Sequence, residues 1–148
     1  MKEYEKIYQS LPTIDTDEIF NEKYPYKCQR AVRFYIQEDI RALCESMPYD
    51  NRAEREFSMY LTVLTNSSVF RVYRLEKMDF CPLLICLTDT YCFEIQLNRY
   101  MYPGDDDLPE PQDWFVSINC SDIEALRHDL GIAFSAFLNK KVSIKTLE

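Results

Sequence analysis

Glycine is nearly absent from this 148-residue chain, which contains only Gly104 and Gly131. Loops that wrap around phosphate groups need several glycines, because their backbone amides must approach the ligand closely. Neither the G-x-G-x-x-G fingerprint nor a P-loop can be built from two isolated glycines. The sequence therefore excludes the ordinary nucleotide-binding α/β enzymes.

Histidine occurs once, at His128, and the cysteines form no C-x-x-C pair. A structural zinc site needs four Cys or His ligands at characteristic spacings, so the sequence predicts no metal site and no cofactor. His128 is expected on the surface of a helix. The cysteines are predicted to be reduced thiols that behave as small apolar residues. They are Cys28, Cys44, Cys81, Cys86, Cys92 and Cys120.

Long apolar runs are also missing. A membrane-spanning helix needs roughly 20 apolar residues, whereas the longest run here, residues 80–87, has the length of a strand. The opening residues MKEYEK lack the apolar stretch of a secretory signal. We therefore expect a cytoplasmic protein that does not bind membranes.

Acidic residues outnumber basic ones, which gives a net charge of −8 and a pI near 4.7. The segment from Pro103 to the end carries four basic and nine acidic residues, a balance of −5. Direct nucleic-acid binding needs clustered Lys and Arg, so it is not expected. A basic protein partner is favoured, because complementary potentials speed and orient encounter. The alternative is that the charge only keeps the protein soluble.

The first 56 residues are predicted to be mainly helical. Apolar residues at helical spacing predict helices over residues 2–10, from residue 16 to about 24, and over residues 27–46. Pro12, Pro25 and Pro48 bound these helices. Residues 50–56 are highly charged and fit either a loop or one more helical turn.

Residues 57–120 are predicted to form an antiparallel sheet of about five strands. In the clearest strand, residues 91–98, apolar side chains alternate with more polar ones, and residues 81–88 are apolar on both faces, as in a central strand. Strands joined by such short turns pair antiparallel, which predicts a meander. The predicted strands cover residues 57–64, 69–76, 81–88, 91–98 and 114–119.

A C-terminal helix is predicted over residues 121–141. Ser121 and Glu124 match a Ser-x-x-Glu capping box, and an apolar stripe from Ile123 to Phe137 is expected to pack on the sheet. The predicted fold class is therefore α+β, with N-terminal helices, an antiparallel meander and a C-terminal helix on the sheet. We expect a single domain over residues 1–148.

An irregular acidic loop is predicted over residues 99–113. It contains three prolines, one of the two glycines, and no calcium-loop pattern. Long loops in compact domains are usually functional or disordered, and aromatic residues rimmed by carboxylates are typical of interfaces. The alternative is a solvated connection whose aromatic side chains fold back onto the sheet. The predicted partner-binding residues are Tyr100, Tyr102, Asp105, Asp106, Asp107, Glu110 and Asp113.

These features favour a non-enzymatic protein that acts by binding a basic protein. The leading hypothesis is a stoichiometric inhibitor, such as a phage or mobile-element anti-defence protein or a toxin-immunity protein. Its carboxylates would mask the surface with which a nuclease, or another nucleic-acid-binding enzyme, holds nucleic acid. One alternative is an acidic chaperone or assembly subunit that acts as a dimer.

A thiol-dependent enzyme that uses Cys120 is a further alternative. Cys120 immediately precedes the predicted C-terminal helix, where the pKa of a thiol can be lowered. It shares a strand face with Trp114, Val116 and Ile118, however, which favours a buried, inert thiol. We therefore predict no catalytic residue.

Overall fold

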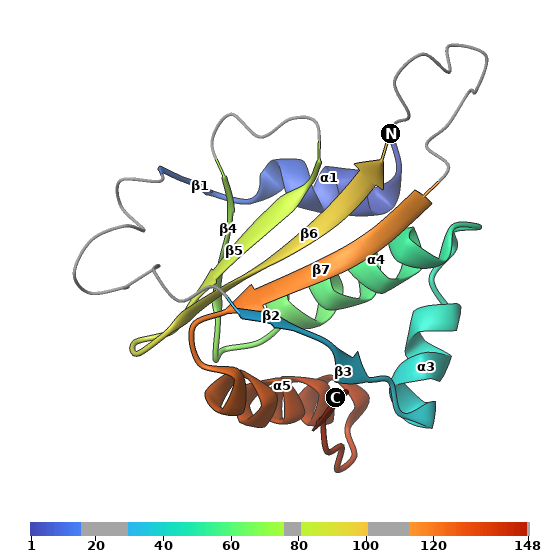
Figure 1. Ribbon diagram of the computed structural model, residues 1–148. Helices are drawn as coiled ribbons and strands as arrows, with labels where there is room; N and C mark the ends of the chain where they lie inside the picture. The colour runs from blue at the N-terminus through green and yellow to red at the C-terminus, as the bar shows by residue number, and fades with distance from the viewer. Residues whose placement is uncertain (16–29, 76–80, 101–112, 148) are drawn as a thin grey trace.

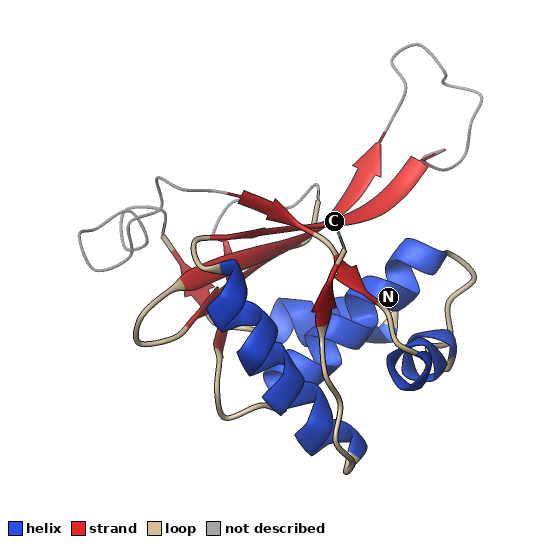
Figure 2. Cartoon of the chain, turned by 60° about the horizontal axis from the view of Figure 1, so that its bottom comes forward, coloured by secondary structure: helices blue, strands red, loops and turns tan. Residues whose placement is uncertain are grey.

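The chain folds as an α+β domain in which helices pack against one sheet. A computed structural model describes residues 1–15, 30–75, 81–100 and 113–147. Figure 1 shows the strands side by side with α4 behind them, and Figure 2 shows the helices gathered on one side of the sheet. The predicted fold class is confirmed, including the C-terminal helix on the sheet.

The described residues form four helices. They are α1 (Glu3–Ser10), α3 (Glu38–Glu45), α4 (Arg52–Thr65) and α5 (Ile123–Leu138). The prediction for residues 2–10 is confirmed by α1, whereas the helix expected from residue 16 lies outside the described residues. The predicted capping box of α5 is wrong by one residue. The side chain of Asp122 accepts a hydrogen bond from the Ala125 amide, while Ser121 bonds to the backbone of Cys92.

The main sheet has the strand order β1-β4-β5-β6-β7-β2. The strands β4 to β7 form the predicted antiparallel meander, and two short strands extend it at the edges. One edge strand, β1, runs parallel to β4, so the sheet is not wholly antiparallel. The strands are β1 (Thr13–Ile14), β2 (Arg30–Val32), β4 (Arg71–Leu75), β5 (Leu83–Leu87), β6 (Cys92–Tyr100) and β7 (Asp113–Cys120). A separate pair joins β3 (Phe34–Tyr35) to β8 (Lys145–Thr146).

Both faces of the central strands are buried. On the helix side, Phe93, Ile95 and Leu97 of β6 join the main core, as their alternation predicts. On the other side, Ile85 of β5 and Cys92 of β6 belong to a second apolar cluster. All five residues of β5 are buried, which confirms that it is a central strand.

Residues 57–64 were expected to form the first strand, and that prediction is wrong because they lie within α4. The apparent alternation is misleading, since Ser58 and Tyr60 are buried as fully as Phe57 and Met59. Among residues 57–64 every residue except Thr62 is buried, so this part of the helix carries no polar stripe that would reveal a helical period. The side chain of Asn51 accepts hydrogen bonds from the Ala53 and Glu54 amides and marks the start of α4.

The helix expected over residues 27–46 is also wrong in its described first half. Residues 30–32 pair with the free edge of β7, from Arg30 opposite Cys120 to Val32 opposite Ile118. Within residues 30–46 only Glu38–Glu45 is helical, so this stretch is less helical than predicted. Pairing with β7 provides hydrogen-bond partners for backbone N–H and C=O groups at the edge of the sheet. Because the two strands are far apart in the sequence, local periodicity cannot reveal this stabilisation.

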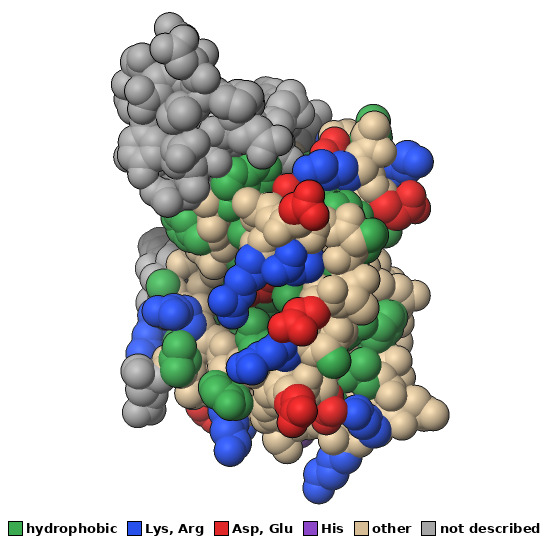
Figure 3. All heavy atoms as spheres, turned by 90° about the vertical axis from the view of Figure 1, so that its right-hand side faces the viewer, with side chains coloured by type: hydrophobic (Ala, Val, Ile, Leu, Met, Phe, Trp, Pro, Cys, Tyr) green, Lys and Arg blue, Asp and Glu red, His purple; other side chains and the backbone are tan. Residues whose placement is uncertain are grey.

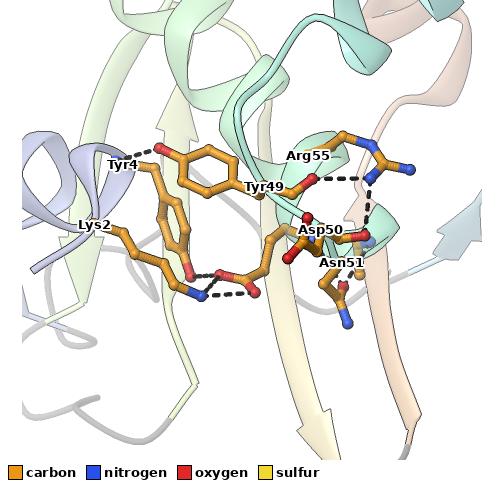
Figure 4. Close-up of polar contacts among 8 residues, drawn as sticks. Lys2, Tyr4, Tyr49, Asp50, Asn51 and Arg55 are labelled. Carbon is orange, nitrogen blue, oxygen red and sulfur yellow. Dashed lines mark hydrogen bonds and ion pairs between the residues drawn. The ribbon is translucent and has the colours of Figure 1, made fainter.

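A partly buried ion pair joins Lys2, at the start of α1, to α4 (Figure 4). The Glu54 side chain is 5% exposed, and Lys2 Nζ donates to its two carboxylate oxygens at 2.6 and 2.9 Å. The Tyr4 hydroxyl donates to the same carboxylate, while the Tyr4 amide donates to the Tyr49 hydroxyl at 3.1 Å. These contacts fix the N-terminal helix on the first turn of α4.

Replacing Lys2 by Met is expected to lower the free energy of unfolding by about 2 kcal/mol, because the buried Glu54 carboxylate loses its cation. The matched control is Lys6→Met, one turn further along the chain in α1. Lys6 pairs with the exposed Glu3 at 3.7 Å, so less than about 0.5 kcal/mol should be lost. Urea unfolding followed by circular dichroism measures both. Equal losses would contradict a special role for the Lys2–Glu54 pair.

Candidate functional site

The predicted partner-binding residues belong to the β6–β7 hairpin. Tyr100 ends β6 and Asp113 begins β7, and the two residues are paired across the strands. The other predicted residues lie outside the described part of the chain. They are Tyr102, Asp105, Asp106, Asp107 and Glu110.

The end of this hairpin extends beyond its neighbouring strands. The pairing of β5 with β6 reaches only Leu83 opposite Gln96, with one further hydrogen bond of 3.0 Å from the Leu97 amide to the Pro82 carbonyl. The pairing of β2 with β7 covers only residues 118–120. Residues 98–100 and 113–115 therefore form a two-stranded projection, which we call the hairpin arm (Figure 2). In the sequence, the acidic segment, residues 101–112, lies between the two strands of the hairpin arm.

A hollow of about 610 Å³ lies at the base of the hairpin arm. One wall is the face of α4 that carries Arg52, Glu56 and Tyr60, spaced four residues apart so that they lie along one side of the helix. The opposite wall includes Trp114 and Phe115 from β7. The segment between β2 and α3 closes the hollow, together with Leu147 near the end of the chain.

Arginines surround this hollow. Arg33, Arg41 and Arg52 line it, and all three are exposed. An adjoining hollow of about 440 Å³ shares Arg41 and Arg52 and adds Arg55. We call the two hollows together the arginine groove. Figure 3, which views the molecule from this side, shows Lys and Arg side chains across the face, with Asp and Glu side chains between them and hydrophobic side chains nearby.

Two glutamates accompany the four arginines of the groove, Glu56 in the larger hollow and Glu45 in the smaller. Burial raises the pKa of the half-buried Glu56 carboxyl, and the nearby Arg52 and Arg33 guanidinium groups partly oppose that rise. Burial likewise raises the pKa of the Tyr60 hydroxyl, with Glu56 adding to the effect. The groove is therefore locally positive within a chain of net charge −8.

The arrangement of the groove suits recognition of an anion. The arginines offer planar, bidentate donors, and the aromatic side chains offer apolar surface for a flat group. Among the described residues, no group of three or more His, Cys, Asp or Glu side chains could hold a metal ion. The predicted surface position of His128 is confirmed, since it is exposed on α5 and outside the arginine groove.

The sequence alone does not predict the arginine groove. Arg33 and Arg41 fall within the single helix predicted over residues 27–46, and Arg52 falls within residues 50–56, which fit either a loop or one more helical turn. The useful signal was Asn51 as a helix cap followed by Arg52, Glu56 and Tyr60 at four-residue spacing. Treating residues 57–64 as a strand concealed that pattern.

The thiol of Cys120 lacks the properties of a nucleophile. Its residue has no exposed surface, and burial raises the pKa of the thiol to about 11. The Cys120 sulfur donates to the Asp122 carbonyl at 3.2 Å and accepts from the Asp122 amide at 3.3 Å. These two bonds hold the sulfur at the start of α5, so its role in the structure is to join β7 to the helix.

Alkylation with iodoacetamide is expected to modify Cys120 at least ~100-fold more slowly in the native protein than in the denatured chain at pH 7.5, because a raised pKa lowers the thiolate fraction. Peptide mapping by mass spectrometry measures the rate for each cysteine. Cys81, which is half-buried, serves as the internal control and should react faster than Cys120. Rapid native labelling of Cys120 would revive the thiol-enzyme hypothesis.

Comparison of the chain with protein-family models, curated proteins and solved structures found no match. Within the described residues, no helix is both long enough and apolar enough to cross a membrane. Function must therefore be inferred from the side chains and surfaces of this chain itself.

Proposed function

We propose that this protein is a non-enzymatic, stoichiometric inhibitor that binds a basic protein through the acidic segment at the end of the hairpin arm. The observation that carries the proposal concerns the residues that flank that segment in the sequence. Tyr100 and Asp113 are paired at the end of a projection that two strands form beyond the rest of the sheet.

Charge supports the same proposal. Residues 101–112 contain four acidic residues and no basic one, and Asp113 follows them directly. Such a concentration of carboxylates attracts a cationic surface and raises the rate of encounter with it. Tyr100 and Tyr102 would supply the aromatic anchors that carry much of the binding energy in protein interfaces.

The partner class that we propose is a nuclease or another nucleic-acid-binding enzyme. Such enzymes present clustered Lys and Arg to the phosphate backbone, and a row of carboxylates can occupy the same surface. Inhibition would then be stoichiometric, since the protein competes with nucleic acid for one site. An anti-defence or toxin-immunity role is the biological setting in which an inhibitor of this kind would act.

Capture from a lysate of the source cells, at low and at moderate salt, is the first experiment. The proposal expects one basic nucleic-acid enzyme, released as the salt concentration rises. The purified enzyme is then assayed with nucleic acid in the presence of increasing amounts of this protein. Complete inhibition at a one-to-one ratio supports the proposal, whereas binding without loss of nucleic-acid binding contradicts it.

Changing Asp105, Asp106 and Asp107 together to Asn is expected to weaken binding to that enzyme by about 10- to 100-fold and to reduce its salt dependence. The matched control removes three carboxylates elsewhere, with Glu3→Gln, Glu38→Gln and Asp50→Asn. These residues are exposed and lie outside the hairpin arm. Because each triple variant neutralises three carboxylates, the change in net charge is the same in both. Equal weakening by both triple variants would show that net charge, rather than the acidic segment, drives binding.

A further inference from the structure

We propose that the arginine groove binds a small molecule in which an anionic group is attached to a flat ring. The anionic group would be a phosphate or a carboxylate, held by the arginines at the mouth of the larger hollow. The ring would lie against the aromatic wall. The residues that line this site do not belong to the acidic segment, and its ligand has the opposite charge to the protein partner proposed above.

The arginine side chains of the larger hollow make few polar contacts. With other described residues, Arg33, Arg41 and Arg52 make no side-chain hydrogen bond or ion pair, although Arg33 and Arg52 are attracted to the Glu56 carboxylate. By contrast, exposed Lys140 pairs with Asp39 at 2.6 Å, and Arg127 pairs with Glu124 at 2.8 Å. Three guanidinium groups line this hollow with one carboxylate, Glu56, so positive charge exceeds negative charge there and an anionic ligand would offset the excess.

The three arginines reach the hollow from different elements. Arg33 lies between β2 and β3, Arg41 belongs to α3, and Arg52 is the first residue of α4. The 14-residue helix α4 also directs its positive N-terminal end toward this region. Guanidinium forks from separate directions can contact several oxygens of one phosphate or carboxylate, in place of the backbone amides of a glycine-rich loop.

Exposed apolar side chains are concentrated at the same hollow. Among the described residues six large hydrophobic side chains are exposed, and three of them, Tyr35, Phe115 and Leu147, line this hollow. Trp114 lines it as well. Tyrosine, tryptophan and phenylalanine rings offer stacking surface for a planar ligand group, and an adjacent arginine strengthens such contacts. A purely ionic ligand would leave this surface exposed.

The size of the hollow favours a small molecule over an extended polymer. Its volume of about 610 Å³ lies within the range of roughly 300–1,000 Å³ that is usual for small-molecule sites. The Glu56 carboxyl inside the hollow disfavours a second anionic group at depth. We therefore expect the charged group at the mouth and the ring, with any N–H donor facing Glu56, toward the interior.

Isothermal titration calorimetry of the full chain tests the proposal with defined probes. Adenosine and uridine monophosphate represent ring-bearing phosphates, and indole-3-acetate represents a ring-bearing carboxylate. Inorganic phosphate, adenosine and a poly-glutamate peptide are the comparison probes. At least one ring-bearing anion should bind with a dissociation constant below about 1 mM, and at least ~10-fold more tightly than phosphate or adenosine alone.

The variant Arg41→Gln/Arg52→Gln should weaken that binding at least ~10-fold, since charge-assisted hydrogen bonds to the anion are lost. The matched control is Arg30→Gln/Lys6→Gln, which removes the same charge at exposed positions outside the groove and should bind as the unaltered protein does. Circular dichroism confirms folding. If the double variant is unfolded, the single exposed change Arg41→Glu replaces it.

Three results would overturn the proposal. They are the absence of binding by every ring-bearing anion, equal binding by inorganic phosphate alone, and tighter binding by the poly-glutamate peptide, which would indicate a docking surface for an acidic chain. The Asp105, Asp106 and Asp107 triple variant should still bind the small anion. The Arg41/Arg52 variant should still bind the basic enzyme, so failure of either proposal can be recognised separately.

Discussion

The rest of the structure depends on the burial of α4. This helix contacts α1, α3 and α5 as well as strands β4, β6 and β7, so it is enclosed by both layers of the domain. Its middle residues, from Phe57 to Leu64, fill the space between the sheet and the other helices. Near its N-terminal end, Glu54 holds α1, while Arg52 and Glu56 face the arginine groove. One element therefore builds the core and supplies a wall of the groove.

Acidic and basic residues are unevenly distributed along this chain, although its net charge of −8 conceals the fact. The acidic residues cluster in the sequence between the ends of the hairpin arm, whereas four arginines gather at the groove near its base. β7 joins the two regions, because Asp113 begins the arm and the next residues, Trp114 and Phe115, line the groove. Electrostatic recognition responds to local potential rather than to net charge, so one chain can attract both a cationic and an anionic partner.

Local patterns predicted the meander of β4 to β7 and the C-terminal helix, because short turns and helical stripes are properties of adjacent residues. They did not predict α4, since its residues 57–64 are almost all buried and this apolar run resembles a strand. They also missed β2, whose partner strand lies more than 80 residues away at Ile118–Cys120. In both cases contacts between distant parts of the chain, rather than the local spacing of apolar residues, determined the secondary structure.

The two candidate surfaces differ in the same way. The acidic segment can be recognised from sequence because its carboxylates are neighbours in the chain. Arg33, Arg41 and Arg52 converge only after three elements have packed, and no spacing rule brings them together. The scarcity of glycine excludes the phosphate loops made from backbone amides, but it does not exclude an anion held by side chains. The absence of a glycine-rich phosphate loop excludes one way of binding an anion. An anion can still be bound by side chains that the fold brings together.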